Sequence, residues 1–227
     1  MDYKYVSIGT QCTVPTLFEN LGIKKETLPF DWMFSTPEFI YTILKLLLID
    51  KIDINTIVEK DFFLCDKKAS THMHMYGTDH HTINPSGNIL VNSKYDVTFP
   101  HDTLDDITKY IRRFNRLYGL ISDKTNFIYF VYISSPSPSS AYTIDGKRPI
   151  QDLYNYINKI NSLIKSMRNN YKILVFNTGN DSEKILNDEN IIYINLQEKS
   201  HWKELLPQLE SIFNYFFSNN LLKKPIT

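Results

Sequence analysis

Cys12 is the residue whose type and position best suit nucleophilic chemistry in this sequence. Residues 3–8 alternate and are rich in β-forming side chains, residues 9–11 end that run, and residues 13–21 have the pattern of a helix. Cys12 is therefore expected where an N-terminal strand turns into a helix. The dipole and N–H groups of a helix N-terminus stabilise a thiolate, which predicts a lowered pKa, and these N–H groups could form an oxyanion hole. The alternative is a small buried cysteine that packs behind the strand.

A cysteine nucleophile needs an imidazole within hydrogen-bond reach and a third group that orients the imidazole. His101 lies between a predicted strand and a predicted helix, so it can reach the same sheet edge as Cys12. Asp102 is its neighbour in sequence, and adjacent side chains on an extended segment diverge. Asp102 is a further catalytic candidate, but this divergence favours Asp102 or Thr103 as the cap of the following helix and Asp31 as the group that orients the histidine. The alternatives are a His101 bonded to backbone and, for Asp31 with Trp32, a buried turn with the indole in the core.

A second set of residues offers another base. Glu198-x-x-His201 lies between a predicted strand and the last predicted helix, and Asn180 follows the strand before it. This arrangement is similar to esterases of the lipase type with a flavodoxin-like fold, and that likeness implies a site of Cys12 with Asn180, Glu198 and His201. Cysteine in place of serine, and glutamate in place of aspartate, depart from the pattern.

The second half of the chain predicts the architecture that must position these side chains. Strands and helices alternate there, with strands expected at 127–133, 171–176 and 191–196 and helices at about 102–121, 149–167 and 205–217. We therefore predict one α/β domain over residues 1–227, a three-layer fold with a mostly parallel, Rossmann- or flavodoxin-like sheet. An irregular insertion at about 61–100 is expected to hold a small hairpin, with strands at 88–91 and 95–99.

Ligands of such sheets bind beyond the carboxyl ends of the strands, where the predicted loops gather. We expect Gly9, Gln11, Trp32 and Ser134 to contact the substrate. The Pro/Ser-rich loop that starts at Ser134 is a candidate lid, because long structureless loops are often functional.

Charge and composition narrow the classes of partner. The chain has 25 basic and 25 acidic residues, a balance that provides no electrostatic attraction for nucleic acid or for an anionic membrane. The apolar stretch at 39–49 is too short to span a bilayer, and no apolar leader follows the start. Two cysteines favour a reducing compartment, so a cytoplasmic location is expected. No Gly-rich phosphate loop is present, and we expect no cofactor. The sequence does not indicate an oligomeric state.

Two clusters of polar residues, one of histidines and one of arginines, could be functional or could simply face solvent. The histidines at positions 72, 74, 80 and 81, with Cys65 nearby, are ligand types suited to zinc, but their spacing does not form a closed site, so we predict a solvated loop and no metal. Arg112, Arg113 and Arg116 either contact an anionic substrate or line the solvent side of an amphipathic helix.

Several blocks in order resemble a family of uncharacterised proteins described as "putative papain-like cysteine peptidases". The likeness covers about the first 135 residues and continues more weakly to Trp202. Its blocks are the Gly-x-x-Cys turn at 9–12, the Pro-Phe-Asp-Trp block at 29–32, the His-Asp pair at 101–102 after Phe99, and an arginine-bearing helix at 109–116.

The resemblance implies a thiol hydrolase or acyl transferase with Cys12 as nucleophile and His101 as general base. Its substrate would be an amide, isopeptide or ester of a protein or a small acyl compound. Pro100 and Thr103 depart from the family pattern around the histidine. Papain-like folds also place the histidine on an antiparallel sheet, whereas the second half of this chain predicts a parallel one. The alternative function is a non-catalytic interaction protein on the same fold.

Overall fold

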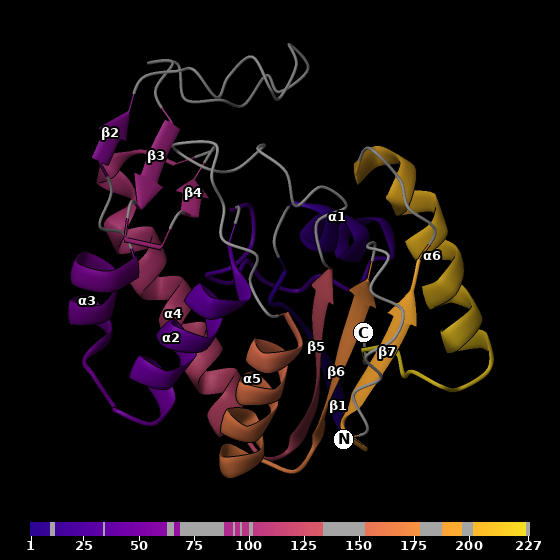
Figure 1. Cartoon of the computed structure of the whole chain (residues 1–227). Coiled ribbons are helices and arrows are strands. Elements are labelled where there is room, and N and C mark those ends of the chain that lie inside the picture. The colour runs from indigo at the N-terminus through magenta and orange to yellow at the C-terminus, as the bar shows by residue number, and fades with distance from the viewer. Residues whose placement is uncertain are drawn as a thin grey trace.

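The structure is a computed structural model with a four-stranded, fully parallel sheet at its centre (Figure 1). The strands lie in the order β1 (Asp2–Ser7), β5 (Asn126–Ile133), β6 (Tyr171–Asn177) and β7 (Ile191–Asn195). The structure describes residues 1–9, 12–33, 35–62, 66–68, 89–92, 94–95, 97–99, 102–133, 153–177, 188–196 and 202–225.

Helices cover both faces of this sheet. On one face lie α2 (Pro37–Leu48), α4 (Ile107–Ser122) and α5 (Leu153–Met167), and on the other lie α1 (Thr13–Asn20) and α6 (Trp202–Ser218) (Figure 1). Successive strand residues alternate between the two cores: Phe130 packs with the first set of helices and Val131 with the second. The predicted three-layer α/β fold with a parallel sheet is confirmed.

Local sequence explains where the helices on the first face begin. Thr36 is extended and its side chain accepts the N–H of Phe39 at 3.1 Å, with Pro37 at the first helical position. Before α4 comes a 3₁₀ turn, Leu104–Asp106, whose N-cap is Thr103. The Asp106 carboxylate accepts the N–H of Thr103 at 2.6 Å. The cap of this segment is therefore Thr103 and not Asp102.

A small antiparallel sheet contains the predicted hairpin. Strand β3 (Ile89–Asn92) pairs with β4 (Val97–Phe99), as expected to within a residue or two, and also with β2 (Asp66–Lys68), which the sequence did not predict. Figure 1 shows this sheet at upper left, on the side of α3 and toward the end of the molecule to which the parallel strands point. The segment α3 (Ile54–Ile57), continued by a π-helical turn at Val58–Phe62, was also unpredicted. Across the described ranges, no helix is long and apolar enough to cross a membrane.

Candidate active site

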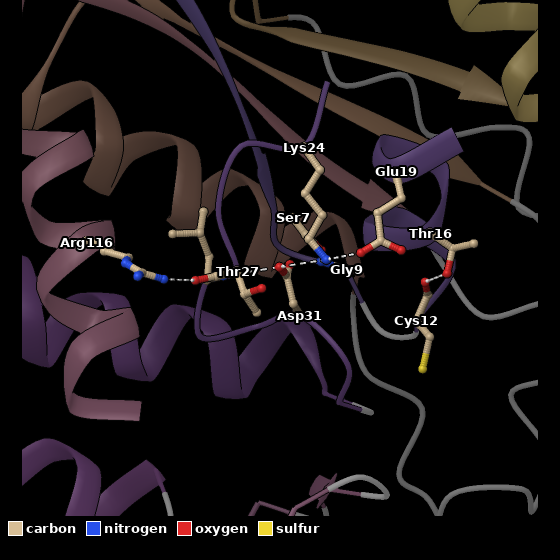
Figure 2. A network of polar contacts seen from close by, with 10 residues as sticks. Ser7, Gly9, Cys12, Thr16, Glu19, Lys24, Thr27, Asp31 and Arg116 are labelled. Carbon is tan, nitrogen blue, oxygen red and sulfur yellow. Dashed lines mark hydrogen bonds and ion pairs between the residues drawn. The ribbon is translucent and has the colours of Figure 1, made fainter. Parts of the chain in front are cut away.

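Cys12 lies at the predicted junction of strand and helix. Ile8 extends the pairing of β1 by donating its N–H to Val131 O at 3.0 Å, and Cys12 is the N-cap residue of α1. The carbonyl of Cys12 accepts the N–H of Thr16 at 3.1 Å and its hydroxyl at 2.8 Å, as Figure 2 shows for the hydroxyl. A Cβ on Gly9 would lie 2.9 Å from Val14 Cγ2, so the turn packs tightly against the first turn of α1.

The thiol of Cys12 differs from the prediction in its pKa. The pKa of Cys12 is raised to about 12, mainly by burial and to a smaller extent by the negative charge of Asp31, against a backbone hydrogen bond at Cys12 itself that lowers it. The prediction of a lowered pKa was wrong because the low polarity around the sulfur outweighs the helix N-terminus. Cys12 is half-buried, and at pH 7 it carries its proton.

The Asp31 turn is held against the Cys12 turn. Ser35 Oγ donates to the carbonyl of Gly9 at 2.8 Å, and both residues are buried. Asp31 is only 3% exposed, and its carboxylate accepts the N–H of Leu28 at 3.1 Å. Burial raises the pKa of Asp31 to about 6, although the charges of Lys24 and Arg113 and the Leu28 N–H lower it. The structure thus places a buried, titratable carboxyl within electrostatic range of Cys12 (Figure 2).

Lys24 and Trp32 flank this carboxyl. Lys24 Nζ lies 3.9 Å from Asp31 Oδ2, 2.8 Å from Glu19 Oε1 and 4.3 Å from the centroid of the Trp32 ring (Figure 2 for the two ion pairs). Trp32 is half-buried and has a φ of 64°, a left-handed conformation that is unusual for a bulky residue. The indole is therefore neither fully buried in the core nor fully exposed, and the Lys24 ammonium lies over its ring.

Asp102 is anchored by the helix that follows it. Its two carboxylate oxygens accept hydrogen bonds from Lys109 Nζ and Tyr110 Oη, both at 2.5 Å. Asp102 is 3% exposed, and burial together with this carboxylate holds the pKa of Tyr110 well above its usual range. These bonds fix Asp102 to α4, and a role of Asp102 in catalysis stays a prediction.

The three arginines of α4 have three different environments. Arg112 is exposed, and Arg116 pairs with Glu26 at 3.1 Å and donates to the carbonyl of Thr27 at 3.4 Å (Figure 2 for Thr27). Arg113 is buried, with its guanidinium carbon 5.0 Å from the centroid of the Tyr110 ring. Arg112 therefore fits the solvent-facing interpretation, Arg116, whose side chain is 38% exposed, fits it in part, and Arg113 does not.

Asp102, Lys109, Tyr110 and Arg113 form one polar group at the start of α4. The sequence offered Arg113 as a contact for an anionic substrate, but it did not predict that Lys109 and Tyr110 bind Asp102. A signal was present for Arg113: it stands between Tyr110 and Phe114 in the buried stripe of α4, which continues through Leu117. A charged residue inside an apolar stripe indicates a partner in the protein or a ligand.

The remaining predicted site residues lie outside the described part of the chain. These are Gln11, His101, Ser134, Asn180, Glu198 and His201, together with Cys65 and the histidines at 72, 74, 80 and 81. Within the described ranges, no group of three or more histidine, cysteine, aspartate or glutamate side chains could hold a metal ion.

Comparisons with known proteins extend over most of the chain. It is 24% identical over 230 residues to "Uncharacterized protein R408" of Acanthamoeba polyphaga mimivirus, an alignment that covers 90% of this chain and 97% of the viral protein. No solved structure matches. A family model described as "Putative papain-like cysteine peptidase (DUF1796)" matches residues 3–145, a range that includes Cys12, Asp31, Asp102 and all of α4. Because this match spans more than half of the sequence, the chain belongs to that family.

Proposed function

We propose that this protein is a cysteine-dependent hydrolase in which Cys12 is the nucleophile, His101 the general base and Asp31 the group that orients His101. The observation that carries the proposal is the buried carboxyl of Asp31 beside the Cys12 turn, at the carboxyl end of β1, where parallel sheets bind ligands. The description of the family supports a hydrolase.

The state of the thiol determines which mechanism is proposed. Because the pKa of Cys12 is about 12, the thiol is neutral at pH 7 and must lose its proton during attack. This requires a base, in contrast to a preformed thiolate. His101 precedes Asp102, which α4 holds in place, and Asp31 is mostly ionised above pH 6 and can accept the second ring N–H of an imidazole.

The proposed reaction is acyl transfer through a thioester. His101 takes the thiol proton as the Cys12 sulfur bonds to the substrate carbonyl carbon, whose π electrons move to oxygen. Collapse of this oxyanion breaks the bond to the leaving nitrogen or oxygen, which receives the proton from the imidazolium. Water, deprotonated by His101, then attacks the thioester and releases the carboxylic acid, and the thiol regains its proton.

The substrate is proposed to be an amide, isopeptide or ester that binds between the Cys12 turn and the Asp31 turn. Gly9, Gln11, Trp32 and Ser134 are its proposed contacts. For Gly9, its position in the Cys12 turn supports this role, since its carbonyl accepts Ser35 Oγ from the Asp31 turn. For Trp32, the half-buried indole beside Asp31 supports it.

One feature of the parallel sheet favours a second candidate base, His201. The carboxyl ends of β6 and β7 lie at the same edge as the end of β1, and Asn177 Nδ2 donates to Asn195 Oδ1 at 3.3 Å across them. The segments that hold Asn180, Glu198 and His201 start from these ends. An esterase-like site with Cys12 and His201 is therefore the second candidate. A neutral thiol would also suit the third candidate, a non-catalytic interaction protein.

Chemical labelling of the two cysteines distinguishes these three candidate functions. Because the proposed base removes the thiol proton during attack, a thiol-directed alkylating probe should modify Cys12 of the native protein faster than Cys65 at pH 7 despite the raised pKa of Cys12, with rates read by peptide mass spectrometry. His101→Ala should slow labelling of Cys12, and His201→Ala should not; the opposite pattern favours the esterase-like site. Slow labelling of both cysteines, unchanged by either substitution, would refute both hydrolase candidates.

A further inference from the structure

Arg113 is a buried cation whose hydrogen bonds are incomplete. Its exposed fraction is 9%, and Nη1 has no hydrogen-bond partner among the residues that the structure describes. Of the carboxylates just before α4, Asp102 and Asp106 are bonded to Lys109, and Asp105 is exposed. A buried guanidinium nitrogen without an acceptor costs free energy, so its retention in a helix stripe calls for an acceptor.

The position of Arg113 relates it to the candidate active site. Its guanidinium lies over Tyr110, 5.0 Å from the ring centroid, and Tyr110 in turn donates to Asp102. The residues next to Arg113 and Asp31 are in contact, since the ring centroids of Phe114 and Phe30 lie 6.2 Å apart, and the charge of Arg113 lowers the pKa of Asp31. Arg113 therefore belongs to the polar group that holds Asp102, and its charge acts on Asp31 of the candidate active site.

We infer that Nη1 of Arg113 donates to a carboxylate of the bound substrate, so that the protein acts on compounds with a carboxylate near the bond that is cleaved. The assignment of this carboxylate to a substrate rests on the proposed function, whereas the site itself does not. Guanidinium groups match carboxylates in shape and charge. The neighbouring Asp31 repels any anion, and it repels a doubly charged phosphate about twice as strongly as a singly charged carboxylate.

Nη1 is covered in this structure, so a ligand reaches it only when a neighbouring side chain moves aside. Small probes are therefore the right choice. N-acetylglycine has a free carboxylate beside an amide, and N-acetylglycinamide has nearly the same shape without the charge.

The experiment is a titration of the protein with each probe, followed by NMR of the arginine side chains labelled with ¹⁵N and ¹³C. Arg113→Lys assigns the Arg113 signal. We expect a saturable shift of the Arg113 Nε and Cζ signals with N-acetylglycine, and at least tenfold weaker binding of N-acetylglycinamide. Arg112→Gln, on the exposed side of the same helix, should leave the affinity for N-acetylglycine unchanged.

The absence of a saturable shift in the wild-type protein, or equal binding of the two probes, would overturn the inference, and neither outcome depends on how an Arg113 variant folds. Alkylation of Cys12 by iodoacetamide in the same sample tests the hydrolase separately. Carboxylate binding with an inert Cys12 would refute the proposed function alone. A reactive Cys12 without carboxylate binding would refute this inference alone.

Discussion

Replacing Asp31 by asparagine should stabilise the protein at neutral pH. The pKa of this carboxyl is raised from 3.8 to about 6 by burial, against the attraction of Lys24 and Arg113. The unfolded chain therefore loses this proton near pH 4, whereas the folded chain keeps it up to about pH 6. The folded state binds more protons in this window, so its stability falls as the pH rises through it.

The magnitude follows from the shift. Burial of this carboxyl costs the folded wild-type protein about 3 kcal/mol at pH 8, where it is ionised, and about 1.5 kcal/mol at pH 5, where it takes up a proton on folding, since one pKa unit corresponds to about 1.4 kcal/mol. An asparagine side chain at this position carries no such cost, and its oxygen can still accept the N–H of Leu28. The free energy of unfolding of Asp31→Asn should therefore exceed that of the wild type, and the difference should grow with pH.

Urea unfolding at pH 5 and pH 8, followed by circular dichroism, measures this difference. Asp105→Asn, which changes an exposed carboxylate, is the control and should leave the stability nearly unchanged. A stabilisation by Asp31→Asn that is absent, or that is the same at both pH values, would refute the account of a buried ionised carboxyl. If Asp31 orients the base, the same variant should also slow alkylation of Cys12, although loss of the Asp31 charge by itself lowers the pKa of the thiol.

Three further predictions concern the turns around the site. Tyr110→Phe should lower the free energy of unfolding by about 1–3 kcal/mol in a urea titration, because buried Asp102 loses one of its two donors; an unchanged midpoint would contradict the bond. Gly9→Ala should destabilise by about 1 kcal/mol or more, because its Cβ meets Val14, and a double-mutant cycle with Val14→Ala should reveal coupling; additive effects would contradict the contact. Because the pKa of Cys12 is raised to about 12 from 9.0, wild-type stability should fall relative to Cys12→Ala by about 1 kcal/mol from pH 8 to pH 10, and parallel pH profiles would contradict the raised pKa.

The sequence predicted those elements whose pattern is strong in the chain itself. Strand β5 is nearly all β-branched or aromatic and is covered on both faces, and Cys12 lies at the predicted junction of strand and helix before α1. The α3 segment and β2 were missed because each is too short to show a period. Their placement depends on tertiary contacts, as with Asn92, which donates to the carbonyls of Asp61 and Phe62.

The candidate site was predictable in position but not in electrostatics. The strand-to-helix turn located Cys12, and the Pro-Phe-Asp-Trp block located Asp31. Burial of a sulfur or a carboxyl depends on segments distant in sequence, such as Ser35 against Gly9, and no local pattern contains that information. This is why the direction of the Cys12 pKa was predicted wrongly.

The most direct test of the account is whether Cys12 forms an acyl-enzyme. Mixing the wild-type protein with p-nitrophenyl acetate should release a burst of nitrophenolate of about one equivalent per protein molecule, with the acetyl group found on Cys12 by mass spectrometry and lost again on standing. Cys12→Ala should abolish the burst, and His101→Ala should slow it. A protein that shows no burst, or whose acetyl group is found only on other residues, would contradict the proposal that Cys12 is a catalytic nucleophile.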